Sequence, residues 1–585
     1  MEGLPANMIF EQRKLNENAL DELIKAGTHP VLARLFASRG IDGPQDTLLE
    51  LKNLIPPTQL KNCLSAAKFL ADAFEKNTPI LIVADYDCDG ATACAVGIRG
   101  LTALGQSFNT KIDFLVPNRF TMGYGLTPEV VDLAASRLPK PGILLTVDNG
   151  IASIAGVDHA NSLGIQVLVT DHHLPGDTLP QAASIVNPNQ PDCSFPSKAL
   201  AGVGVMFYLL LALRAEFRER GIFTNETQPK LESLLDLVAL GTVADVASLD
   251  RNNRILVSGG LRRIRQGLAQ PGIKALFNVA NREIPKANAF DLGFAVGPRL
   301  NAAGRLADMT LGIRCLNTDD ETEANRLAYE LDRINRERRV IESDMQESAL
   351  ENLVDVDVQQ IYGLCLTDPT WHQGVIGILA SRLKERYHRP VLIFAQGEDA
   401  NTNEPVLKGS GRSITGFHLR DALDWISKKH PDLIMKFGGH AMAAGLTIPA
   451  SGFDLFNQTF NEIAQLWIDE ASLNRRLVHD GELNPSEIEA DLAQILSDQV
   501  WGQGFPQPVF MGTFEVAKQP LLKDKHLKLE LFPANNTPVS GKPLPAIWFG
   551  RSESLPNIVK LAYRLGVDNF LGYPRTQLFI EAAEL

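Results

Sequence analysis

Three aspartates follow an apolar run near the start of the chain, in the segment ILIVADYDCDG at residues 80–90. Asp85, Asp87 and Asp89 alternate with other residues, so three like charges stand within five positions. Such charges repel one another, and a buried carboxylate is unfavourable unless a cation or hydrogen-bond donors compensate it. Two interpretations are open at this point: a solvated turn in which one aspartate caps the next helix, or a group of carboxylates around a cation.

More acidic residues and two histidines follow other apolar runs. Asp148 comes after ILLTV, the group Asp171, His172 and His173 comes after VLVT, and Asp245 comes after LVALGTVA. Each residue alone has an ordinary explanation as a turn or helix cap. Together, carboxylates with imidazoles suit Mn²⁺ or Mg²⁺ better than a metal that prefers thiolates. We therefore expect a site for two such ions, which can activate water and bind a phosphoryl group.

The segments around these residues predict an α/β domain. From about residue 60 to 275, β-rich runs alternate with helical patterns, which is typical of a parallel sheet covered by helices on both faces. In such sheets the functional site lies beyond the carboxyl ends of the strands. The acidic residues are expected to meet at that edge.

The rest of the chain predicts further domains. A polar, helix-favouring stretch begins at Thr318 and Glu321, which have the spacing of a capping box. A second α/β pattern follows it, and short strand-like pieces between turn signals then predict a small β-barrel of the OB type. The expected segments are a helical lead-in (1–50), a main α/β domain (51–318), a connecting helix (319–355), a smaller α/β domain (356–455) and a C-terminal OB-like domain (456–585).

Composition narrows the class of protein. Of the 585 residues, 45% are hydrophobic and 21% charged, which is ordinary for a globular protein. The net charge of −13 argues weakly against a general binder of polyanions. Six scattered cysteines predict free thiols in a reducing compartment. No apolar run has the length of a membrane span, and the N-terminus does not resemble a secretory signal, so we expect a cytoplasmic protein without membrane attachment.

The order of the motifs resembles a known family. DYDCDG, VDNG, DHH and VADV resemble motifs I to IV of the DHH phosphoesterase superfamily. The later segments GPRLNAAGRL, WHQGVIGI, GSGRS and FGGHAMAAGL resemble, within that superfamily, the RecJ family of exonucleases specific for single-stranded DNA. The resemblance extends from about residue 60 to 450, and the C-terminal region fits in position and character.

The resemblance implies a set of metal ligands. Asp87 would bind one ion and Asp89 the other, with Asp148 bridging both. His172 and Asp245 would complete the second site. The ions would be Mn²⁺ or Mg²⁺.

The resemblance also implies catalytic and orienting groups. His173 would face the scissile phosphate, while Asp85 and Asp171 would orient the ligands. One position departs from the pattern of many DHH enzymes, which have a histidine four residues before the second aspartate of motif I. This chain has Val83 there, so the first ion would have fewer protein ligands.

Substrate contacts are implied in both α/β domains. The candidates are Arg119, Tyr124, Arg299, Asn301, Arg305, Ser410, Arg412 and His440. Ser410, Arg412 and Arg119 would form a pocket for a 5′-phosphate, and Tyr124 is a candidate for stacking. Each has an alternative: a glycine turn with an exposed arginine, a salt bridge, or aromatic core packing.

The implied activity is two-metal, in-line hydrolysis of single-stranded DNA from the 5′ end, releasing 5′-mononucleotides in DNA repair and recombination. The family further implies a monomer that works with single-strand-binding protein and a repair helicase. Two alternatives are open. One is a DHH phosphodiesterase acting on short oligonucleotides, cyclic dinucleotides or pyrophosphate; the other is an inactive DHH-like scaffold that binds DNA.

Overall fold

The computed structural model describes residues 8–119, 121–354, 357, 360–399, 402–534, 541–568 and 573–584. The chain divides into two compact units, each described here by itself. The smaller unit comprises the chain up to residue 11 together with residues 335–478. The larger unit comprises residues 12–334 and 479–585.

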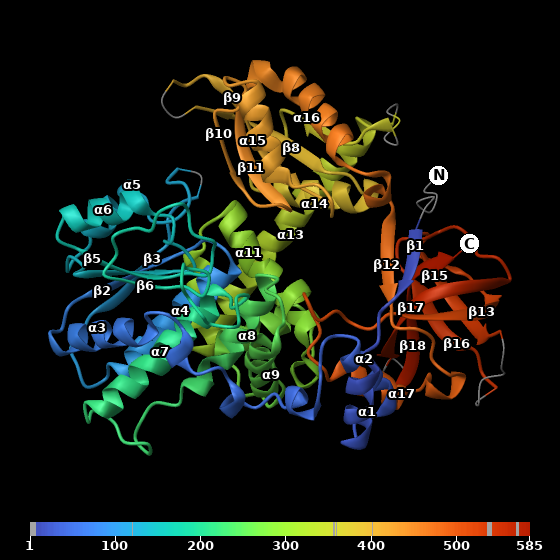
Figure 1. Cartoon of the computed structure of the whole chain (residues 1–585), viewed down its shortest axis with the longest axis horizontal. Coiled ribbons are helices and arrows are strands. Elements are labelled where there is room, and N and C mark those ends of the chain that lie inside the picture. The colour runs from blue at the N-terminus through green and yellow to red at the C-terminus, as the bar shows by residue number, and fades with distance from the viewer. Residues whose placement is uncertain are drawn as a thin grey trace. The chain divides into compact units, whose positions relative to one another are not determined.

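A parallel sheet forms the centre of the larger unit, with its strands in the order β3-β2-β4-β5-β6 (Figure 1). The strands are β2 (Ile80–Ala84), β3 (Ile112–Leu115), β4 (Ile143–Val147), β5 (Gln166–Thr170) and β6 (Ser184–Val186). Every residue of β2 and β4 is buried, as expected for a parallel sheet that helices cover on both faces. One face carries α5 (Pro128–Ala135) and α6 (Ile154–Ser162); the other carries α3 (Cys63–Glu75), α4 (Cys88–Leu104) and α7 (Gly202–Glu219).

Helices continue the larger unit after the sheet. They are α8 (Leu235–Ala244), α9 (Arg251–Arg265), α10 (Pro271–Val279), α11 (Gly297–Leu306), α12 (Thr310–Asn317) and the start of α13 (Glu321–Glu351). The capping box expected at Thr318 and Glu321 is not the cap of α13. Instead, the Asp320 side chain accepts hydrogen bonds from the backbone N–H groups of Thr322 and Glu323. None of the described helices combines the length and the apolar character needed to cross a membrane.

The smaller unit contains a mixed sheet in the order β10-β11-β9-β8-β7. Its strands are β7 (Leu364–Thr367), β8 (Val391–Glu398), β9 (Pro405–Arg412), β10 (Lys436–Gly439) and β11 (Ala443–Pro449), and its helices after α13 are α14 (Ile376–Tyr387), α15 (Leu419–Lys429) and α16 (Phe453–Trp467). Phe456 and Phe460 of α16 are fully buried in its apolar core. A helix that the sequence assigned to the C-terminal domain therefore packs in this unit.

A closed β-barrel ends the chain. Its strands are β13 (Phe510–Lys518), β15 (His526–Pro533), β16 (Leu544–Trp548), β17 (Ile558–Asp568) and β18 (Arg575–Glu584), with β14 (Leu521–Leu522) beside β15 and α17 (Ala490–Ser497) before the barrel. Pairing of β13 with both β15 and β17 closes the ring. Of four aromatic residues left open between core and DNA contact, Trp501, Phe505 and Trp548 are buried, and Tyr573 is exposed. The predicted α/β fold with an OB-like barrel is confirmed.

The start of the chain joins the barrel region to the rest of the larger unit. Strand β1 (Met8–Gln12), which was expected to be helical, pairs with β12 (Arg475–His479), and α1 (Glu17–Lys25) and α2 (Pro30–Ala37) follow it. Just after α2, Arg39 donates two hydrogen bonds to Asp480, of 2.7 and 2.8 Å. The Arg39 and Asp480 side chains are only 1% and 2% exposed. This buried ion pair ties the N-terminal segment to the chain that enters the barrel.

Replacing Asp480 by alanine should destabilise the larger unit strongly. The buried Arg39 guanidinium would lose its carboxylate partner, which costs about 3–5 kcal/mol in the free energy of unfolding. Thermal unfolding of the full chain should show the loss, and the double variant Arg39→Met with Asp480→Leu should recover much of it. The matched control is Lys25→Ala, which removes an exposed ion pair with Glu22. An equal, small effect of Asp480→Ala and Lys25→Ala would contradict this prediction.

Candidate metal centre

The carboxyl ends of three neighbouring parallel strands carry the predicted acidic residues. The DYDCDG segment follows β2, Asp148 follows β4, and Asp171, His172 and His173 follow β5. Asp245 arrives from elsewhere, as the C-terminal cap of α8. Three groups of side chains have ligand atoms that lie within 4.8 Å of one another: Asp85, Asp87 and Asp148; Asp89, His172 and Asp245; and Asp148, His172 and His173.

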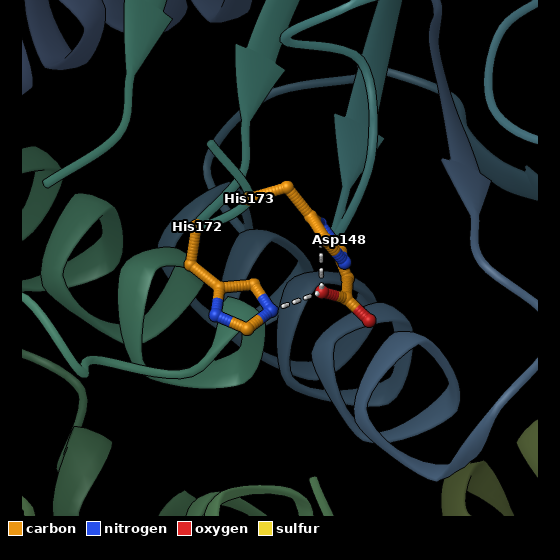
Figure 2. Close-up of side chains that lie close together, drawn as sticks. All are labelled: Asp148, His172 and His173. Carbon is orange, nitrogen blue, oxygen red and sulfur yellow. Dashed lines mark ion pairs between the residues drawn. The ribbon is translucent and has the colours of Figure 1, made fainter. Parts of the chain in front are cut away.

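His172 lies at the centre of these groups. Its Nε2 is 3.0 Å from Asp148 Oδ1, 3.8 Å from Asp89 Oδ2 and 3.9 Å from Asp245 Oδ2. Figure 2 shows His172 and His173 converging on the Asp148 carboxylate. Asp148 stands in two of the three groups, so one carboxylate links the two sets of donors.

Motif I combines both interpretations that the sequence left open. Asp87 caps α4, because its Oδ1 accepts a 3.0 Å hydrogen bond from the N–H of Gly90. Its carboxylate nevertheless also belongs to the group with Asp85 and Asp148. Asp89, in the first turn of the same helix, accepts hydrogen bonds from the first two N–H groups of α7, those of Gly202 (2.7 Å) and Val203 (2.9 Å). Helix N-termini thus hold two of the carboxylates in place.

The carboxylates are in a strongly unfavourable electrostatic position by themselves. Burial, together with the charge of Asp87, raises the pKa of Asp89 to about 7. Burial and the neighbouring aspartates likewise raise the pKa values of Asp148 and Asp245 well above their usual range. Burial lowers the pKa of His172 to about 4, so its imidazole is neutral near pH 7, as a metal ligand requires.

This arrangement fits divalent cations. Asp148 Oδ1 is buried and accepts no hydrogen bond from any atom that the structure describes. The donors around it are carboxylate oxygens and imidazole nitrogens, the set that Mn²⁺ accepts and that suits Mg²⁺ through its oxygens. A cation here would compensate like charges that nothing else in the group neutralises.

His173 differs from His172 in its charge. Burial lowers the pKa of His173, but the hydrogen bond of its Nδ1 to Asp171 (2.7 Å) and the charge of that carboxylate raise it, to about 9 overall. Asp171 also accepts hydrogen bonds from the backbone N–H groups of His172, His173 and Ile151. Asp171 therefore orients the histidine segment, the role that the resemblance implied for it, and keeps His173 cationic.

The structure shows why Val83 is not a ligand position here. Its side chain is fully buried in the apolar core between the sheet and α5 and α6. A carboxylate is available instead, because Asp85 offers an oxygen close to those of Asp87 and Asp148. Asp85 can thus supply a ligand as well as orient the loop, where its Oδ1 accepts a hydrogen bond from the N–H of Tyr86.

Helix α11, which carries the GPRLNAAGRL segment, packs against the loop of motif I. Asn301 Oδ1 accepts a 2.8 Å hydrogen bond from the N–H of Cys88. A β-carbon at Gly304 would lie 1.8 Å from the Tyr86 carbonyl oxygen, so only glycine permits this approach. Asn301, expected from the resemblance to contact DNA, is therefore placed to fix the loop between Asp87 and Asp89.

Replacing Asn301 by alanine should weaken metal binding. The Cys88 N–H would lose its acceptor, and the loop that carries two ligands would lose a support; comparable changes behind metal ligands cost about 10–100-fold in affinity. Titration of Mn²⁺ by calorimetry would measure the change. Binding of single-stranded DNA in EDTA should stay at the wild-type level. Weakened DNA binding in EDTA with normal Mn²⁺ affinity would instead make Asn301 a DNA contact.

Arg299 is placed as a structural residue. Its side chain is buried and lies 2.8–2.9 Å from Asp332 of α13. It also donates hydrogen bonds to the carbonyl oxygens of Ala295 (2.5 Å) and Val279 (3.4 Å). The geometry favours the salt-bridge alternative over a DNA contact for this arginine. Arg305, on the same helix, is half-buried.

Two other candidate DNA contacts lie at the metal centre. The Tyr124 ring is 49% exposed, and its hydroxyl is 3.3 Å from His173 Nε2. The Arg119 guanidinium lies over the Tyr86 ring, 4.5 Å from its centroid. A half-exposed aromatic ring and a cation thus border the carboxylates, where a nucleotide would have to bind.

The remaining candidates belong to the smaller unit. Ser410 and Arg412 lie on β9 and face the first turn of α14, where a β-carbon at Gly377 would come within 2.9 Å of Ser410 Oγ and 3.2 Å of Arg412 Nη2. Burial lowers the pKa of Arg412, and among the described residues no carboxylate forms an ion pair with it. His440 is exposed, between β10 and β11.

Residues that support the site were not foreseen. The Gly202 N–H binds Asp89, and the Asn149 side chain donates hydrogen bonds to the carbonyl oxygens of Val83 (3.1 Å) and Val147 (2.9 Å), which joins β2 to β4. Asn149 stands within the VDNG motif, which gave a signal for it. Gly202 has no such signal in one sequence.

Family models cover most of the chain. The DHH family N-terminal domain matches residues 79–242, the DHHA1 domain matches 357–466, and the RecJ OB domain matches 479–582. The fold and the metal centre define a DHH phosphoesterase.

Relatives identify the branch of that superfamily. The single-stranded-DNA-specific exonuclease RecJ of Escherichia coli is 49% identical over 98% of this chain and 99% of its own length. That of Bacillus subtilis is 35% identical over 75% of this chain and 53% of its own length. A crystal structure of RecJ from Thermus thermophilus with Mn²⁺ matches all of this chain and 80% of its own, with a TM-score of 0.81 at 28% identity. This chain belongs to the RecJ family.

Proposed function

We propose that this protein is a metal-dependent exonuclease that hydrolyses single-stranded DNA. The observation that carries the proposal is the meeting of Asp87, Asp89, Asp148, His172 and Asp245 at one edge of the parallel sheet, in a chain that resembles RecJ exonucleases along its length. Crystal structures of RecJ from Thermus thermophilus contain Mn²⁺ or Mg²⁺, and the ligand atoms here suit both ions.

The ligands divide into two sets that share Asp148. Asp89, His172 and Asp245 would hold one ion, and Asp87 and Asp148, with Asp85 beside them, would hold the other. Bound there, the ions supply activation of water and neutralisation of the phosphate charge. Asp171 keeps His173 cationic, so His173 can donate a hydrogen bond to an oxygen of the scissile phosphate. Tyr124 and Arg119 border the position of the terminal nucleotide.

We propose that Ser410 and Arg412 recognise a 5′-phosphate, and thereby set a 5′→3′ direction with release of 5′-mononucleotides. Support comes from three features of the smaller unit. Arg412 is a largely buried cation without an acidic partner among the described residues, Ser410 adds a hydroxyl donor, and both face the N-terminus of α14. A helix N-terminus with a guanidinium is a favourable environment for a phosphate.

Digestion of one single strand labelled at either end tests this proposal. With Mn²⁺ or Mg²⁺ we expect mononucleotides from the 5′ end first, and faster cleavage of a strand with a 5′-phosphate than with a 5′-hydroxyl. Replacing Arg412 by alanine should reduce that preference about tenfold or more, because charge-assisted hydrogen bonds to the phosphate are lost. The control is Arg420→Ala, an exposed arginine of α15. First release from the 3′ end would refute the direction, and an unchanged preference in Arg412→Ala would refute the pocket.

The same digestion separates the two alternative functions. A phosphodiesterase for short oligonucleotides or cyclic dinucleotides would cleave those substrates and leave a long single strand intact. An inactive scaffold would bind the strand and release nothing with either metal. The match of residues 479–582 to the RecJ OB domain and the complete set of ligands favour the exonuclease.

We further propose that the protein is a cytoplasmic monomer that acts in DNA repair and recombination, with single-strand-binding protein and a repair helicase as partners. The family resemblance supports this assignment. Sedimentation of the purified protein tests the monomer, and a single mass of 64.0 kDa is the expected result. Faster digestion of DNA coated with single-strand-binding protein would support that partner.

A further inference from the structure

Two exposed aromatic rings stack on each other beside the metal centre. Phe290 and Phe294 are 49% and 68% exposed, with ring centroids 4.7 Å apart and ring planes inclined by 24°. Large apolar side chains that remain this exposed as a pair indicate a surface for contact with another molecule. The mechanism described above does not use them.

The segment that carries the pair is unusual in its backbone. Residues Asp291–Val296 form a π-helical turn between Phe290 and α11. Such turns are rare and frequently occur at functional sites. The π-helical turn is a second observation, independent of exposure, that points to this segment.

The same segment packs against elements that carry metal ligands. A β-carbon at Gly293 would lie 3.2 Å from the Val243 side chain, and one at Gly297 would lie 3.0 Å from the β-carbon of Ala244, in the last turn of α8 before Asp245. Further along, Asn301 binds the loop of motif I. The aromatic pair therefore stands at the start of a segment that borders the metal centre on two sides.

A cation is fixed at the aromatic pair. Arg282 Nε lies 3.4 Å from Asp291 Oδ1, in the residue next to Phe290, and the Arg282 side chain is 45% exposed. Aromatic rings combined with nearby positive charge form the usual surface for single-stranded nucleic acid, in which bases stack on the rings and phosphates contact the cations.

We propose that Phe290 and Phe294 form a stacking platform for bases of single-stranded DNA next to the metal centre. This inference rests on the proposed exonuclease function, because it takes the substrate strand as the occupant. The platform would hold the strand by its bases without reading their sequence, since every base has a face to stack. A protein partner is the competing occupant of the same surface.

The experiment compares rings with apolar side chains of similar size. The double variant Phe290→Leu with Phe294→Leu removes the rings and keeps apolar surface, while Phe290→Tyr with Phe294→Tyr keeps the rings. Leu64→Ala, an exposed apolar residue of α3, is the control for loss of exposed apolar surface. Full-length protein is mixed with single strands that contain 2-aminopurine, in EDTA, and affinity and fluorescence quenching are measured. Digestion with Mn²⁺ gives KM and kcat separately.

We expect the leucine variant to bind single-stranded DNA about tenfold to a hundredfold more weakly, with less quenching, a higher KM and a nearly unchanged kcat. The tyrosine variant and Leu64→Ala should resemble the wild type. Wild-type affinity and quenching in the leucine variant would overturn the platform and favour a protein partner. Equal losses in the leucine and tyrosine variants would overturn stacking as the interaction. Absence of binding and cleavage by the wild type would refute the proposed function itself.

Discussion

Replacing Asp148 by alanine is expected to lower the rate of metal-dependent DNA hydrolysis by about three orders of magnitude or more. Asp148 belongs to two of the three groups of ligand atoms, and its Oδ1 is 3.0 Å from His172 Nε2. Removing it takes away the carboxylate that links both sets of donors. A neighbouring ligand cannot replace it, because Asp148 reaches this place through a left-handed backbone conformation with φ of 61° directly after β4.

The fold should survive this substitution. In the protein without metal, Asp148 is a buried carboxylate whose pKa burial and the neighbouring aspartates raise. Its removal relieves repulsion, so we expect the metal-free variant to unfold at the same temperature as the wild type or higher. Metal should then distinguish the two proteins: Mn²⁺ should raise the melting temperature of the wild type and not that of the variant.

The isosteric variant Asp148→Asn makes the test sharper. It keeps the volume and removes the charge, so its loss of activity should be similar to that of the alanine variant. Calorimetry with Mn²⁺ should detect weaker binding in both variants. Full activity in either variant, or unfolding of the metal-free alanine variant, would contradict the assignment of Asp148 as a metal ligand.

The positions of Asp85, Asp148 and Asp171 could be predicted from sequence because of one property of parallel sheets. Strands that run in the same direction end at the same edge, so residues directly after β2, β4 and β5 must be neighbours. Asp245 follows a helix, and this argument does not place it. Only its VADV motif, through the family resemblance, indicated that it joins the others.

The supports of the site depend on contacts that are distant in the sequence. Asn301 and Cys88 are 213 residues apart, and Arg299 pairs with Asp332 from a different helix. No periodicity or local motif indicates which backbone N–H an asparagine will bind. For the same reason the sequence could suggest that Arg299 and Asn301 contact DNA, while their side chains are directed at the protein itself.

Val83 shows a different limit. The sequence reveals that a histidine is missing, but it does not reveal what the local structure offers in its place. In the structure, position 83 is part of the apolar core, and the carboxylate of Asp85, two residues later, lies beside those of Asp87 and Asp148. The number of oxygen donors therefore depends on how the loop turns after β2.

Replacing Gly202 by alanine is the second change with a large expected effect. Gly202 begins α7, and its N–H donates a 2.7 Å hydrogen bond to Asp89 Oδ2. An added β-carbon would lie 2.6 Å from both Cβ and Oδ1 of Asp148, closer than non-bonded atoms approach. Either the start of α7 or the Asp148 carboxylate must move. Both movements disturb metal ligands, because one displaces the donor to Asp89 and the other displaces Asp148.

We expect Gly202→Ala to weaken Mn²⁺ binding about 10–100-fold and to lower the free energy of unfolding by about 1–3 kcal/mol. Gly43→Ala is the matched control, because Gly43 has an extended backbone and open space around it. If displaced ligands cause the defect, a large excess of Mn²⁺ should restore part of the lost rate in Gly202→Ala. Wild-type Mn²⁺ affinity in this variant would show that Asp148 and α7 separate without cost, and that the contact between them does not position the metal centre.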